Sequence, residues 1–230
     1  MPIGPLPAMT DLLCNKQGQE YRLLRRKKLL LNWHASLIEE TTMKIVCTGV
    51  KIEQDWAVLA ASCTLGEVDS KSWHKYKIII GSFTRNKAIV RNQLRDILQV
   101  HIHPEYDGKY DSTSDIAAIQ LLPSTSNREN VAESLCIMSH NDLTDSIQAF
   151  RNGLMSASMK AATRRASVGV HRVKVASKLC SSGQFMCSRL VNTNSSQYNL
   201  HHSPVYVRYG ISDTDWGLAG LTTIKSRKTS

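Results

Sequence analysis

Short strand-like runs with turn signals between them are the feature that most constrains the fold. In the first half of the chain these runs occupy residues 29–38, 43–52, 57–61, 76–83 and 96–103. The pairs Gly66-Glu67, Arg85-Asn86 and Pro104-Glu105 lie between them and mark turns. Strand-like runs at such close spacing favour an all-β barrel or sandwich over alternating βα units.

The second half of the chain is patterned less clearly. Residues 124–143 and 154–165 are polar and weakly patterned, and strand-like runs return at 168–175, 204–210 and 216–224. We find no internal repeat. The 230 residues are enough for one two-lobed domain or two small ones, and the 42% hydrophobic content is that of a globular protein. No stretch approaches the 18 apolar residues of a membrane span.

The chain is strongly basic, with 29 Lys and Arg against 19 Asp and Glu and a formal net charge of +10. This balance favours a polyanionic partner such as a glycosaminoglycan, an anionic membrane or a nucleic acid, although a merely soluble basic domain is equally consistent with it. The densest run is Arg25, Arg26, Lys27 and Lys28. It can be interpreted as a proprotein cleavage site, as a polyanion-binding patch or as a solvated charge cluster.

Six cysteines are present, and spacing alone allows 15 pairings of six cysteines. They are Cys14, Cys47, Cys63, Cys136, Cys180 and Cys187, with no C-x-x-C pair, which argues against zinc ribbons and thioredoxin-type sites. A secreted, disulfide-bonded domain is favoured, with Asn194 as a glycosylation acceptor. Residues 1–10 lack the features of a signal peptide, so we expect this chain to be part of a longer secreted protein.

Four ordered segments carry a family resemblance. The run DWAVLAASC at 55–63 resembles W-V-L-T-A-A-H-C of the trypsin-like serine proteases, with Ser62 at the position of the catalytic His. NWHASLI at 32–38 is similar to P-W-x-V-S-L, and CTGVKI at 47–52 is similar to C-G-G-S-L-I. The stretch from HPEY at 103–106 to SDIAAIQL at 114–121 is similar to H-P-x-Y…N-D-I-A-L-I-x-L.

The resemblance implies two antiparallel Greek-key β-barrels, the second truncated at its C-terminal end. We expect a leader at 1–28, a homologous domain at 29–224 and a tail at 225–230. The first barrel is expected at about 29–122 and the second at about 136–224. The family's disulfides imply the pairs Cys14–Cys136, Cys47–Cys63 and Cys180–Cys187.

The resemblance also implies a degenerate catalytic triad at Ser62, Asp115 and His201. A serine hydroxyl is not basic near neutral pH and cannot replace the imidazole at position 62. Alignment on Pro204 places His201 at the nucleophile, or Ser203 if the register slips by two, and Leu200 at the Asp that pairs with the activated N-terminus. The expected protein is therefore no enzyme but a secreted protease homologue that binds other proteins of an extracellular cascade.

Within that class, NWHASL, CTGV and ASC resemble the C-terminal degenerate protease domain of the insect Nudel-type mosaic proteases. Two other functions are also consistent with the sequence. One is an endopeptidase with a rearranged triad that uses Ser203 with His201 or His202. The other is a basic polyanion-binding or antimicrobial module of the azurocidin kind, whose base position is likewise serine.

Other chemistry finds little support in the sequence. The pairs His201 and His202, or His101 and His103, suggest metal ligands, but no carboxylate or cysteine spacing completes a site. No Gly-rich phosphate loop occurs either. We therefore expect no metal, no cofactor, no nucleic-acid partner and no membrane span.

Overall fold

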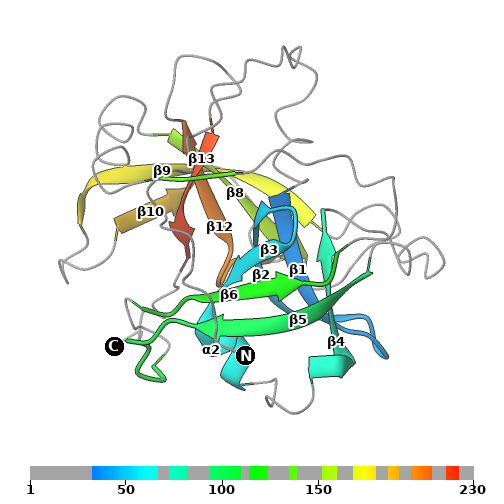
Figure 1. Cartoon of the computed structure of the whole chain (residues 1–230). Coiled ribbons are helices and arrows are strands. Elements are labelled where there is room, and N and C mark those ends of the chain that lie inside the picture. Colours follow the sequence, from blue (N-terminus) through cyan, green and yellow to red (C-terminus); the bar gives the residue numbers. More distant parts are fainter. Residues whose placement is uncertain are drawn as a thin grey trace, which may run out of the picture.

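The computed structural model describes residues 33–66, 73–81, 94–109, 114–123, 135–138, 152–159, 168–179, 186–191, 198–208 and 216–222. Within these residues the regular structure is mostly β, in two lobes (Figure 1). None of the helices described there is long and apolar enough to cross a membrane. The predicted leader and tail lie outside the described residues.

The first lobe is a closed barrel of six antiparallel strands in the order β1-β2-β3-β6-β5-β4. Its strands are β1 (His34–Glu39), β2 (Lys44–Glu53), β3 (Trp56–Leu59), β4 (Tyr76–Ile80), β5 (Leu94–Ile102) and β6 (Ala117–Leu121). A short 3-10 helix, η2 (Trp73–Lys75), precedes β4.

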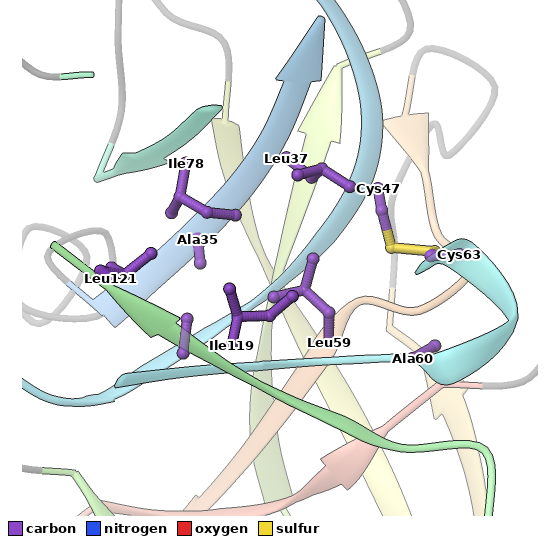
Figure 2. Packing of buried hydrophobic residues seen from close by; sticks show 10 residues of the cluster. Ala35, Leu37, Cys47, Leu59, Ala60, Cys63, Ile78, Ile119 and Leu121 are labelled. Atoms are coloured by element: carbon purple, nitrogen blue, oxygen red, sulfur yellow. A yellow bond between two sulfur atoms is a disulfide. The ribbon is translucent and has the colours of Figure 1, made fainter. Parts of the chain in front are cut away.

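Alternating side chains of these strands fill the barrel. In β6, Ala117, Ile119 and Leu121 are buried and the two residues between them are only partly so, the period-two pattern of a strand with one inward face. Figure 2 shows Ile119 and Leu121 packed with Leu37 of β1 and other apolar residues. Burial of this apolar surface is the main force that stabilises the lobe.

The apolar run at 57–61 is not one continuous strand. Strand β3 ends at Leu59, and the helix α2 (Ala61–Gly66) begins two residues later. The Thr64 hydroxyl donates to the Ala61 carbonyl over 2.7 Å, within this short helix. The helix carries Cys63 to Cys47 of β2, and the predicted disulfide between them is confirmed (Figure 2).

The second lobe is a seven-stranded sheet in the order β10-β9-β8-β12-β13-β7, with β11 also paired to β8. Its strands are β7 (Cys136–Ile137), β8 (Asn152–Met159), β9 (Val168–Leu179), β10 (Met186–Leu190), β11 (Tyr198–Asn199), β12 (Pro204–Arg208) and β13 (Trp216–Leu221). All pairings are antiparallel except that of β13 with β7. The all-β prediction is confirmed, but among the described residues only the first lobe closes into a barrel.

A strand that the sequence pattern did not indicate lies at the centre of this sheet. Strand β8 pairs with β9 and β12 and includes part of the stretch at 154–165, which looked polar and weakly patterned. Met155 and Ala157 face the apolar core of the lobe. Ser156 and Ser158 are also buried, because they face the first lobe.

A buried histidine connects the two lobes. The two ring nitrogens of His34, in β1, lie 2.8 Å from Ser156 Oγ and 3.1 Å from Ser158 Oγ. The hydroxyl of Tyr206, in β12, is 3.1 Å from Ser156 Oγ, and the Tyr206 ring packs against Trp33. Burial lowers the pKa of His34 from 6.5 to about 3, so the imidazole is neutral at pH 7.

Candidate functional site

The site forms where α2 meets Asp115, which lies two residues before β6. The backbone N–H of Ser62 donates to Oδ1 of Asp115 over 2.6 Å, and the Ser62 hydroxyl donates to Oδ2 over 2.7 Å. The Asp115 side chain is only 6% exposed. An ionised carboxylate can only accept hydrogen bonds, so the proton of the Ser62 hydroxyl points to Asp115.

An imidazole from the second lobe completes this cluster. Nε2 of His202 lies 3.2 Å from Ser62 Oγ and 3.8 Å from Oδ2 of Asp115. Because the single proton of the Ser62 hydroxyl is donated to Asp115, the contact between His202 and Ser62 requires Nε2–H as the donor. The other ring nitrogen, Nδ1, then carries a lone pair and lies 2.8 Å from Sγ of Cys63.

The backbone turns His202 inward. Its φ is 58°, in the left-handed region, which His adopts more often than most side chains. Two contacts hold it there: the His202 N–H donates to the Thr222 carbonyl over 2.8 Å, and the Thr48 hydroxyl donates to the His202 carbonyl over 3.2 Å. Because Thr48 belongs to β2, its hydrogen bond fixes the second-lobe loop that carries His202 to the first barrel.

His201, which the sequence placed at the nucleophile position, lies beside this cluster. Its ring packs on the ring of His202 with 3.6 Å between centroids. Its N–H donates to the side-chain oxygen of Asn199 over 3.3 Å. The structure thus brings His202, and not His201, into hydrogen-bond distance of Ser62.

Both histidines are poor bases in this environment. Burial lowers the pKa of His202 from 6.5 to about 3, and the neighbouring His201 lowers it further in the same direction. Burial also lowers the pKa of His201, against an opposing effect of the Asp115 carboxylate. Uncharged imidazoles at pH 7 follow from these shifts.

Ser203, the other serine considered as a nucleophile, is fully buried. Its hydroxyl donates to the Asn199 carbonyl over 3.0 Å, and its N–H donates to the Thr222 hydroxyl over 2.9 Å. The hydroxyl proton is thereby directed to the backbone and away from both imidazoles.

The histidines considered as metal ligands have other contacts. His103 Nδ1 accepts the Glu105 N–H over 3.2 Å in a turn, and the His101 ring packs on Trp56 with centroids 5.6 Å apart. One ligand atom from each of Cys47, Cys63 and His202 lies within 4.8 Å of the others. A metal would need the thiolates of the two cysteines, and the disulfide removes them.

Several predicted site residues lie in parts of the chain that the structure does not describe. Arg25, Arg26, Lys27, Lys28 and Asn194 lie outside the described residues. The predicted bridges Cys14–Cys136 and Cys180–Cys187 also lie outside the part of the chain in which side chains are described. Leu200 is partly buried against the core of the second lobe.

The fold and the site together define a trypsin-like serine protease domain. Residues 25–196, which are 172 of the 230 residues, match the family model described as Trypsin. The chain therefore belongs to the trypsin family. In the catalytic arrangement of such enzymes, the nucleophilic hydroxyl donates to an imidazole and the other imidazole nitrogen donates to the carboxylate. Here the hydroxyl and the imidazole have exchanged places. The hydroxyl of Ser62 donates to the carboxylate of Asp115, and the imidazole of His202 contacts that hydroxyl from the other side.

Proposed function

We propose that this domain is a non-catalytic serine protease homologue that acts by binding. The observation that carries the proposal is the direction of the hydrogen bonds at Ser62. Its hydroxyl donates to Asp115, while His202 contacts it with Nε2 and directs Nδ1 at the disulfide. A general base must accept the proton of the nucleophile, and an imidazole with a pKa of about 3 does this poorly.

A rearranged triad built on Ser203 is disfavoured by the contacts of that residue. A nucleophile needs a hydroxyl that is accessible to substrate and hydrogen-bonded to a base. Ser203 is fully buried and donates to a backbone carbonyl. The remaining acidic partner, Asp115, is already occupied by Ser62.

The setting that we propose is extracellular, with a protease or another protein of a proteolytic cascade or matrix as the partner. The Cys47–Cys63 disulfide supports this setting, because such bonds persist in oxidising compartments. The resemblance of NWHASL, CTGV and ASC to the Nudel-type C-terminal domain supports membership of a large secreted mosaic protein. The net charge of +10 supports a polyanionic matrix component as a further partner.

An active-site probe tests the absence of catalysis. The refolded full chain is incubated with a fluorophosphonate and with fluorogenic ester and peptide substrates, beside an active trypsin-like protease as the positive control. We expect neither labelling nor turnover. Stoichiometric labelling that disappears in Ser203→Ala would establish the rearranged triad, and labelling that disappears in Ser62→Ala would identify Ser62 as a nucleophile. Either result overturns the proposal.

A further inference from the structure

The two lobes differ in whether their basic side chains have acidic partners. In the first barrel, basic side chains pair with acidic ones: Lys77 lies next to Asp96 and Glu40, and Arg95 is 2.7 Å from Asp55. The seven strands of the second lobe, as described, contain no Asp or Glu. They contain five basic residues: Arg172, Lys174, Lys178, Arg189 and Arg208.

Three of these cations gather on one face of the sheet, and we name Arg172, Lys174 and Arg189 the cationic face. Lys174 of β9 is the direct cross-strand partner of Arg189 of β10, so their side chains lie on the same side. Arg172 is two residues before Lys174 and shares that side. All three side chains are exposed.

The register also shows where this face begins. Arg172 is the cross-strand partner of Leu154 in β8, whose side chain packs in the apolar cluster between the lobes with Tyr206. Strands β9 and β10 lie at one end of the sheet (Figure 1), so the cationic face extends from that packing towards this end.

Like charges placed directly opposite each other on neighbouring strands destabilise a sheet. No carboxylate in the described part of the chain forms an ion pair with any of the three side chains. Repulsion between Lys174 and Arg189 would be relieved by an anion bound across both strands. The arrangement thus has the electrostatics of an anion-binding surface.

We infer that the cationic face binds a linear sulfated polysaccharide. Its acidic groups, repeated along the chain, would contact Arg172, Lys174 and Arg189 in turn. Exposed aromatic side chains, on which the bases of a single-stranded nucleic acid stack, are absent from the described residues of β9 and β10. Exposed large apolar side chains, which would enter a membrane, are absent from the same residues. The Cys47–Cys63 disulfide favours an extracellular polyanion.

This inference rests on the proposed binding role but not on the state of the triad. It also differs from the assignment of polyanion binding to Arg25–Lys28, and the experiment separates the two. Affinity of the full chain for size-defined heparin is measured by surface plasmon resonance at several salt concentrations. Three variants are compared: R172Q/K174Q/R189Q; the equal charge change K44Q/K75Q/K109Q on exposed positions of the first lobe; and R25Q/R26Q/K27Q/K28Q. Each variant is first shown to have the parent's melting temperature.

We expect the cationic-face variant to bind heparin at least about tenfold more weakly, with a shallower salt dependence, and the first-lobe variant to bind like the parent. Equal losses in these two variants would indicate an unspecific charge effect and overturn the inference. A loss confined to the 25–28 variant would move the site to that run, and the binding role would stand. Binding of duplex DNA or phosphatidylserine vesicles but not of heparin would overturn the ligand class. Absence of any binding would overturn both the cationic face and the polyanion role, while the probe result above would be unaffected.

Discussion

Ser62 presents both its backbone N–H and its hydroxyl to the two carboxylate oxygens of Asp115, at 2.6 and 2.7 Å. This two-point contact joins the start of α2 to the residues before β6. The carboxylate is almost completely buried, and within the described residues it has contacts with Ser62 and His202. Asp115 therefore acts as a structural anchor for the helix that carries Cys63.

The first prediction concerns the stability that Asp115 provides. Asp115→Ala leaves the N–H and the hydroxyl of Ser62 without their buried acceptor, so we expect the free energy of unfolding to fall by about 2–4 kcal/mol. Urea unfolding monitored by tryptophan fluorescence measures the change. Glu105→Ala, which removes an exposed carboxylate, should change stability by less than about 0.5 kcal/mol. Equal effects of the two substitutions would contradict the anchoring role.

The sequence located part of this site and missed another part. Ser62 and Asp115 follow from their place in ordered segments that resemble the family. His202 could not be chosen over His201, because the choice depends on the backbone: a φ of 58° at His202 turns its ring towards Ser62. The adjacent pair His201 and His202 did indicate a possible site. However, two neighbouring residues of one type give no indication of which side chain points inward.

The strands of the fold, too, were predicted only in part. Strands with one apolar face, such as β6, were visible as alternating or continuous apolar runs. Strand β8 was not, because both of its faces are buried and one of them is lined by Ser156 and Ser158. Those hydroxyls are buried at no large cost because His34 provides their hydrogen bonds. A polar residue that is buried against a partner far along the chain looks the same in the sequence as one that faces solvent.

The second prediction concerns pH. His34 and His202 have folded-state pKa values of about 3, below the 6.5 of the unfolded chain, because burial disfavours their charged forms. Below pH 6.5 the unfolded chain binds these protons first, so the stability is fully present above pH 6.5 and is lost progressively as the pH falls towards 3. Each histidine contributes a slope of at most about 1.4 kcal/mol per pH unit.

Urea unfolding between pH 7 and pH 4 measures this slope. In His34→Gln the amide can still contact Ser156 or Ser158 but does not titrate, so the slope should fall by the share of this one histidine, at most about 1.4 kcal/mol per pH unit. An unaltered slope in His34→Gln would show that this imidazole is not the buried neutral group described here.

The third prediction concerns the disulfide. Cys47 and Cys63 close a loop with a sequence separation of 16, and removing a cross-link of that size costs about 3 kcal/mol. The double variant C47A/C63A should therefore unfold at a clearly lower urea concentration than the parent. Because Cys63 also lies against His202, the variant should gain mobility at the site, which hydrogen exchange at residues 61–66 and 200–203 would detect. Unchanged protection in both segments would show that the disulfide does not organise the site.

The last prediction concerns the close approach of β2 and β3. Gly49 pairs with Leu59, and a Cβ at position 49 would lie 2.2 Å from the carbonyl oxygen of Val58. A backbone atom cannot rotate away as a side chain can, so Gly49→Ala must push β2 and β3 apart. This separation lies next to Thr48 and Cys47, which are the neighbouring residues of β2. We expect a loss of about 3 kcal/mol or more in urea unfolding. Gly108→Ala is the matched comparison, because a Cβ there meets open space and the cost is only that of a φ of 82°, about 1–2 kcal/mol. If Gly108→Ala proved the more damaging of the two, the contact between β2 and β3 would be looser than the structure has it, and the position of Thr48 against the His202 loop would be in question as well.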